Sequence, residues 1–182
     1  LFPYTTLFRS GTFHGDMFDG LGYVTALRKN GCEPKGKRVL LVGAGGAGSA
    51  IAHALVEADV ALLAIHDPDT ARRTGLIERL ICLKKGVIQS GTSDPRGYDI
   101  VLNATPVGMS INDPTPVDVS GLNTMMFVGD VITAPAVTPM LEAARALGCN
   151  TQTGADMFAA VRDLMVAFLL TKADSSTKCN VF

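Results

Sequence analysis

The 182-residue sequence lacks tryptophan and has no excess of charge of either sign. Its 16 Lys and Arg residues nearly balance its 17 Asp and Glu residues, which leaves a formal net charge of -1. The cationic residues are scattered along the chain, so there is no concentrated basic segment of the kind that binds nucleic acid. We therefore predict no nucleic-acid partner.

Cysteine and histidine are also scarce. The sequence contains no CxxC pair and no HExxH motif, so it offers neither a zinc site nor the disulfide framework of a small secreted protein. We predict no bound metal, and reduced thiols in a cytoplasmic protein. The four cysteines are Cys32, Cys82, Cys149 and Cys179.

Long hydrophobic runs are absent as well. No apolar segment approaches the roughly 20 residues that cross a bilayer, so no membrane span is expected. The first ten residues, LFPYTTLFRS, lack the basic start and the cleavage site of a signal peptide. They differ in character from the rest of the chain and look like adapter sequence, so residues 1–10 are predicted to be a non-native leader.

The most informative stretch is KRVLLVGAGGAGSAIAHALVEA, residues 37–58. An apolar run leads directly into six small residues and then into alanine-rich sequence, which indicates a strand, a glycine turn and a helix N-terminus. Such a turn lets backbone amides approach a diphosphate. The alternative is a glycine turn that only permits close packing. The predicted diphosphate-binding residues are Gly43, Ala44, Gly45, Gly46, Ala47 and Gly48.

Asp67 strengthens this interpretation. It ends a second apolar run, Val60 to Ile65, close to the roughly 20-residue offset of an acid that binds an adenosine ribose. Its charge would repel the 2'-phosphate of NADP, so NAD is favoured. Arg72 and Arg73 lie a turn further on and could instead hold that phosphate, although both could equally be solvated helix residues.

Strand and helix patterns alternate along the rest of the chain. This predicts an α/β fold with a doubly wound, mostly parallel sheet of the Rossmann type. Residues 110–121, rich in Pro and Asp, are expected to form an exposed loop. Helices are predicted at 18–30, between 67 and 86, at 138–147 and at 156–171, and strands at 39–42, 60–65, 87–89, 100–102, 125–132 and 151–153.

Thr105 follows the predicted strand 100–102 in the segment YDIVLNATPVGM. Ligands of open α/β sheets bind at the carboxyl ends of strands, so Thr105 is expected to border the nicotinamide. An ordinary proline loop is the alternative. At the start of the first helix, Asp16 and Asp19 could cap the helix or favour its dipole, which is the commoner role of acids there; a catalytic role is the alternative.

Several motifs occur in one order: GDMFDGLGY, VGAGGAG, DPDTARR, NATPVGM, GDVITAPAVTPML and GADM. Together they resemble the shikimate and quinate dehydrogenase family. The resemblance implies an NAD(P)-dependent oxidoreductase that acts at C3 of a cyclohexene or cyclohexane carboxylic acid. It implies that Asp19 is the active-site aspartate that partners a lysine, that residues 43–47 bind the diphosphate, and that Val131 and Gly154 line the nicotinamide.

The chain also departs from this family. Met17 and Phe18 replace Asn-Thr before the aspartate, Thr133 stands in place of a substrate-side tyrosine, and Val161 in place of a glutamine. The substrate pocket is therefore expected to be less polar. A dehydrogenase of a related hydroxy acid, or a non-catalytic NAD-binding module, remains an alternative.

The resemblance further implies an N-terminal substrate domain, with its lysine, that is missing from a truncated chain inactive on its own. We therefore expect a hinge or linker helix in residues 11–34, a dinucleotide-binding domain in 35–150, a C-terminal helix in 151–172 that returns toward that substrate domain, and a tail in 173–182. Flanking helices that lack this cover would expose apolar surface and favour a homodimer.

Overall fold

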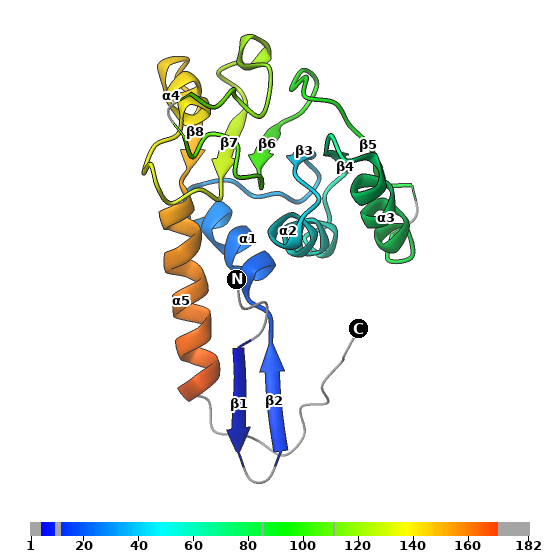
Figure 1. Cartoon of the computed structure of the whole chain (residues 1–182), viewed down its shortest axis with the longest axis vertical. Coiled ribbons are helices and arrows are strands. Elements are labelled where there is room, and N and C mark those ends of the chain that lie inside the picture. The colour runs from blue at the N-terminus through cyan, green and yellow to red at the C-terminus, as the bar shows by residue number, and fades with distance from the viewer. Residues whose placement is uncertain (1–4, 10–11, 85, 111, 171–182) are drawn as a thin grey trace.

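The computed structural model describes residues 5–9, 12–84, 86–110 and 112–170. The predicted tail and part of the predicted leader lie outside these residues. A parallel sheet of six strands in the order β5-β4-β3-β6-β7-β8 forms the centre of the molecule (Figure 1), which confirms the predicted fold class. The strands are β3 (Arg38–Val42), β4 (Leu62–His66), β5 (Ile88–Ser90), β6 (Ile100–Asn103), β7 (Phe127–Asp130) and β8 (Asn150–Gln152).

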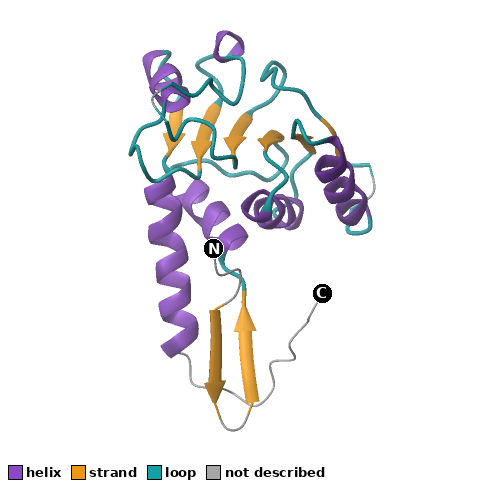
Figure 2. Ribbon diagram, in the orientation of Figure 1, coloured by secondary structure: helices purple, strands orange, loops and turns teal. Residues whose placement is uncertain are grey.

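The strand order reverses between β3 and β6, and open α/β sheets bind their ligands at this switch point. Helices cover both faces of the sheet, with α1 and α2 on one face and α4 on the other (Figures 1 and 2). Each face buries its own apolar cluster. The helices are α1 (Asp19–Lys29), α2 (Gly46–Glu57), α3 (Thr70–Ile81), α4 (Pro139–Ala146) and α5 (Gly154–Leu170).

The second face is covered largely by loops. No helix joins β5 to β6; instead Gly91 lies close to Ala64, and Tyr98 packs against the same cluster. The loop expected to be exposed at 110–121 is partly buried, which corrects the prediction. Val117 is only 2% exposed, and the short helix η1 (Val119–Gly121) follows it. Loops therefore add apolar side chains to those that α4 supplies on this face, because no helix joins β5 to β6.

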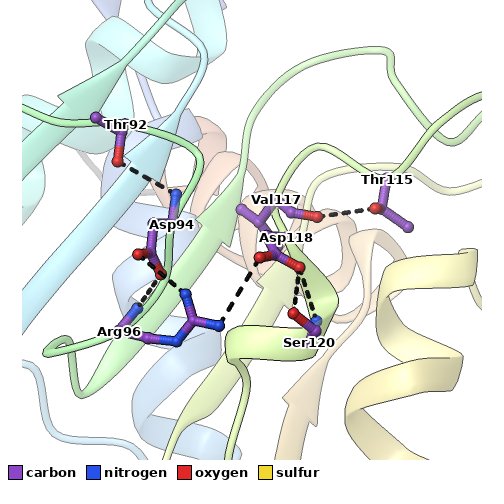
Figure 3. Close-up of polar contacts among 7 residues, drawn as sticks. All are labelled: Thr92, Asp94, Arg96, Thr115, Val117, Asp118 and Ser120. Atoms are coloured by element: carbon purple, nitrogen blue, oxygen red, sulfur yellow. Dashed lines mark hydrogen bonds and ion pairs between the residues drawn. The ribbon is translucent and has the colours of Figure 1, made fainter.

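Arg96 links the two covering loops. Its guanidinium lies 3.2 Å from the carboxylate of Asp94 and 4.0 Å from that of Asp118 (Figure 3). Asp118 in turn accepts hydrogen bonds from the amide and hydroxyl of Ser120. Since these groups are largely exposed, the ion pairs orient the loops more than they stabilise the fold.

An antiparallel hairpin precedes the sheet domain. Its strands are β1 (Thr5–Arg9) and β2 (Thr12–Asp16), and the sequence analysis does not predict either. Asp16 belongs to β2, and the residue before α1 is Phe18, whose side chain makes no capping hydrogen bond. Asp16 therefore lies outside the helix, and Asp19 is its first residue.

Other element boundaries also differ from the predictions, and β7 is shorter at both ends than the strand expected at 125–132. The strand expected at 60–65 is shorter at its start, because Val60 is buried but lies before the β ladder. Helix α5 begins two residues earlier than expected. Thr153 accounts for this, since its hydroxyl accepts from the Asp156 amide while the Asp156 carboxylate accepts from the Thr153 amide, a reciprocal cap.

Within the described residues, none of the helices combines the length and the apolar character needed to cross a bilayer.

Candidate dinucleotide-binding site

The glycine turn sits at the switch point, at the carboxyl end of β3. Gly43 has a φ of +107°, which side chains rarely tolerate, and a Cβ there would collide with the backbone of Ala104. A Cβ on Gly48 would collide with the Gly43 carbonyl. These two glycines therefore bring the start of α2 against the ends of β3 and β6, as the sequence predicts.

Gly45 and Gly46 have a different environment. A Cβ built on either residue meets no atom within 4 Å, so open space lies above the turn. Gly45 is the N-cap of α2, and the first amides of a helix have no partner inside it. Backbone N–H groups at a helix N-terminus favour an anion, and the bare turn leaves room for one. Of the predicted diphosphate residues, Gly45 and Gly46 have room for such a group, whereas the amides of Gly43 and Ala44 already donate to the His66 carbonyl and the Asp67 carboxylate.

Asp67 directly follows β4 and is only 7% exposed. One oxygen of its carboxylate accepts from the Ala44 amide at 2.8 Å, and the other accepts from the Asp69 amide at 2.8 Å. The carboxylate is thus turned toward the glycine turn. Each oxygen keeps one further lone pair with which it could accept a ribose hydroxyl.

The two arginines considered for a phosphate have partners already. The Arg72 Nε lies 3.3 Å from the carboxylate of Asp69, which also caps α3 by accepting from the Arg72 amide. Arg73 donates to the Asp67 carbonyl at 3.3 Å. The loop after β4 and the first turn of α3 therefore carry two carboxylates and two guanidiniums, with one ion pair between them.

Thr105 is held by Asn103, the last residue of β6. The Asn103 Oδ1 accepts from the Thr105 amide at 3.0 Å and from its hydroxyl at 2.7 Å. The Thr105 hydroxyl also accepts from the Val107 amide at 3.1 Å. Because its proton is already donated, this hydroxyl can offer a ligand only its remaining lone pair. The loop continues around a surface hollow lined by residues including Met109 and Ser110.

Asp130, at the end of β7, is fully buried. Its carboxylate accepts from Asn103 Nδ2 at 3.1 Å, from the Ile132 amide at 3.0 Å and from the Thr138 hydroxyl at 2.8 Å. Burial raises the pKa of Asp130, and the three donors oppose that shift. The sequence pattern predicts no role for Asp130 or Thr138, and the signal that could have indicated one is a polar residue at the end of a strand.

Of the residues expected near the nicotinamide, Val131 lies on the loop after β7 and Gly154 packs against that loop. Val131 donates its amide to the Asn103 carbonyl at 3.1 Å, and Thr133 is exposed two residues later. Gly154, the first residue of α5, is buried so close to the Val131 and Ile132 carbonyls that a Cβ would collide with them. The structure thus brings Val131 and Gly154 together beside the loop of Thr105.

Asp19 opens helix α1 and is half-buried, and this burial raises the pKa of its carboxyl. One turn further on, Tyr23 is fully buried with a hydroxyl that has no hydrogen-bond partner among the residues that the structure describes, and burial raises its pKa too. Val161 contacts Gly22, so this predicted substrate-side residue lies where α5 packs against α1. Among the described residues, no His, Cys, Asp and Glu cluster has the arrangement of a metal site.

A parallel sheet with this strand order, a bare glycine turn at its switch point and an acid after the next strand define a Rossmann-type dinucleotide-binding domain. No family model matches the chain. Individual proteins, in contrast, are similar to this chain in sequence and in structure.

The quinate/shikimate dehydrogenase (NAD+) of Corynebacterium glutamicum is 42% identical over 138 residues, which cover 72% of this chain and 48% of the relative. The structure of quinate dehydrogenase from Corynebacterium glutamicum in complex with NAD superposes with a TM-score of 0.83 at 31% identity and covers 91% of this chain and 61% of that one. A 5-ketofructose reductase of a Gluconobacter species gives a TM-score of 0.81 at 34% identity, with 91% and 61% covered. Curated relatives are named for NAD+ or for NADP+.

The chain is therefore similar over most of its length to the nucleotide-binding part of shikimate and quinate dehydrogenases. It spans about half the length of the curated relatives that it matches.

Proposed function

We propose that this chain is the nucleotide-binding part of an NAD(P)-dependent shikimate or quinate dehydrogenase. The observation that carries the proposal is the open space above Gly45 and Gly46 at the N-terminus of α2, with the Asp67 carboxylate turned toward the same turn. The turn would hold the diphosphate on its amides, and the spare lone pairs of Asp67 would accept the hydroxyls of the adenosine ribose.

NAD is the preferred cofactor in this proposal. The 2'-phosphate of NADP would lie near the carboxylates of Asp67 and Asp69, where like charge opposes it. Arg72 already pairs with Asp69, and Arg73 already donates to a carbonyl, so both would have to rearrange to hold a phosphate. NADP is therefore the second candidate cofactor, and Arg72 and Arg73 would hold its 2'-phosphate.

Nicotinamide supplies the carbon that accepts or donates hydride. Thr105, Val131 and Gly154 would enclose its ring, and the Thr105 hydroxyl would accept from its carboxamide N–H. Asp19 would lie on the substrate side. A carboxyl whose pKa is raised by burial is suited to share a proton with a lysine at the reacting hydroxyl.

The remainder of the enzyme would cover α1 and α5. Helix α5 extends from the sheet on the side of α1 (Figure 1), and its exposed apolar residues include Phe158, Val166 and Leu170. Such a surface is typical of an interface with another domain. We propose that these helices contact a substrate domain that supplies the lysine.

A dehydrogenase of a related hydroxy acid is the second candidate. The similarity to 5-ketofructose reductase favours it, because that protein is named for a different substrate. The apolar Met17, Phe18 and Val161 favour it as well, since they replace polar residues of the family pattern. Thr133 would then contact a substrate other than shikimate.

The cofactor proposal is tested by titrating NADH into the 182-residue chain and following NADH fluorescence. Gly46→Asp places a carboxylate in the open space and should weaken binding by tenfold or more, as expected for like charges at short range (on the order of 1 to 2 kcal/mol). Gly75→Asp, on helix α3, is the matched control and should bind as the wild type does. Equal binding by both variants would exclude this turn as the diphosphate site.

The substrate proposal needs a separate experiment. Fusing the substrate domain of a relative ahead of Gly11 should restore hydride transfer with shikimate or quinate under saturating NAD or NADP. If NADH binds but neither acid reacts, the shikimate and quinate assignment is wrong, and 5-ketofructose is the next substrate to assay. Tight NADH binding with no activity toward any of them supports a non-catalytic module.

A further inference from the structure

Buried side chains join the two loops that would enclose the nicotinamide. Asn103 ends β6 and Asp130 ends β7, and these strands are neighbours in parallel register with the two residues paired. Both side chains are fully buried, and Asn103 Nδ2 lies 3.1 Å from Asp130 Oδ1. We call Asn103 and Asp130 the clamp.

Asn103 determines the shape of the loop after β6. Its Oδ1 holds the amide and hydroxyl of Thr105, and its Nδ2 also donates to the Val107 carbonyl at 3.2 Å. The opposite orientation of the amide would set an N–H against the Thr105 amide, so only one orientation satisfies every partner. The conformation of this loop therefore depends on where the Asn103 side chain lies.

Asp130 determines the shape of the loop after β7 in the same way. Its Oδ1 accepts from the Ile132 amide, and its Oδ2 accepts from the hydroxyl of Thr138, the N-cap of α4. Thr138 also contacts the first turn of α4, since its hydroxyl oxygen accepts from the Leu141 amide at 3.4 Å. One carboxylate thus ties β6, the loop of Val131 and the start of α4 together. No cation pairs with it within the described part of the chain, so hydrogen bonds alone hold this buried acid.

We propose that Asn103 and Asp130 are positioning residues that set the separation of the Thr105 and Val131 loops, and thereby hold the nicotinamide half of the cofactor for hydride transfer. This inference rests on the proposed function, because it assumes that a nicotinamide lies between these loops. Neither clamp residue need touch the cofactor. The clamp lies at the ends of β6 and β7, whereas the proposed ribose site lies at the end of β4, on the other side of β3.

The decisive measurement compares NADH with ADP-ribose, which has the same adenosine and diphosphate but no nicotinamide. The wild-type 182-residue chain should bind NADH more tightly than ADP-ribose by about tenfold, the worth of one or two hydrogen bonds. Asp130→Ala should remove this advantage by weakening NADH binding, and should leave ADP-ribose binding within about twofold, since its site is elsewhere.

Asp130→Asn is the matched rescue variant. Its amide oxygen can accept from Asn103 Nδ2 and the Ile132 amide, while its NH2 can donate to the Thr138 oxygen, so most of the NADH advantage should return. Thr138→Val provides a second test if Asp130→Ala does not fold, because it removes only one donor. It should reduce the advantage partially, and circular dichroism would show that each variant is folded.

Two results would overturn the inference. If Asp130→Ala or Thr138→Val weakens NADH and ADP-ribose equally, the clamp has only a structural role. If the wild type binds both ligands equally, the two loops do not hold a nicotinamide. A wild-type chain that binds neither ligand would instead refute the proposed function itself, which distinguishes the two failures.

Discussion

At the scale of single residues, Asp67 combines a structural role with a proposed binding role. Its two oxygens hold the amides of Ala44 and Asp69, so the same carboxylate supports the glycine turn and the loop after β4. The sequence pattern indicates a ribose ligand but does not reveal this second role. Any substitution of Asp67 will therefore affect both cofactors as well as the choice between them.

We expect Asp67→Ala to weaken the binding of NAD and NADP together, because two backbone amides lose their acceptor. The ratio of the two dissociation constants should nevertheless move toward NADP by on the order of tenfold, since a carboxylate near the 2'-phosphate is removed. Calorimetric titration of both cofactors measures that ratio. Asp94→Ala, on a loop of the second face, is the control, and an unchanged ratio in Asp67→Ala would refute the charge argument.

At the scale of elements, some glycines allow helices to pack closely, whereas another glycine of the same motif faces open space. Gly48 lies against the Gly43 carbonyl and Gly22 against Val161, so α2 approaches β3, and α5 approaches α1, more closely than a side chain permits. Gly46 instead faces open space. The glycine motif therefore contains a packing position, Gly48, and, two residues before it, the open position that we propose for the diphosphate.

Two alanine variants separate these roles. Gly48→Ala should lower the free energy of unfolding by about 1 to 3 kcal/mol, because the methyl group collides with backbone that cannot move away freely. Gly46→Ala should leave stability nearly unchanged and weaken NADH binding, since its methyl group projects into the space above the turn. Urea denaturation and NADH titration of both variants test the contrast, which fails if Gly46→Ala is the less stable protein.

At the scale of the whole molecule, α5 has the smallest buried share of the α-helices in the described part of the chain. Only Gly154 and Ala160 are buried along its 17 residues. Its apolar stripe, made of Met157, Val161, Leu164, Met165 and Phe168, is half-buried. Phe18 contacts Phe168 with ring centroids 5.4 Å apart, so α1 covers part of the stripe. The exposed remainder is the surface that we assign to a second domain.

We expect the isolated chain to self-associate through this surface. Val166→Gln and Leu170→Gln together should shift the protein toward the monomer in size-exclusion chromatography, because both side chains are exposed and apolar. The free energy of unfolding should change by less than about 1 kcal/mol, as for other surface substitutions. Arg162→Gln, on the same helix, is the control; an unchanged elution volume in the double variant would assign self-association to another surface.

Much of this architecture could be predicted because its signals are local. The run before Gly43, the glycines and the acid at Asp67 lie within one strand, turn, helix and strand unit, where neighbouring residues dictate backbone geometry. The loop at 110–121 could not be predicted as partly buried. Pro and Asp are typical of exposed loops, and only the lack of a helix between β5 and β6 requires Val117 to fill the second face.

The amino-acid sequence by itself determined the fold class and the position of the glycine turn, because strand, turn and helix preferences act over a few residues. Only the tertiary structure decided that Asn103 and Asp130, 27 residues apart, would share a buried hydrogen bond. Their contact requires β6 and β7 to be adjacent and parallel in one register. That pairing results from burying both faces of the sheet together, which no local pattern specifies.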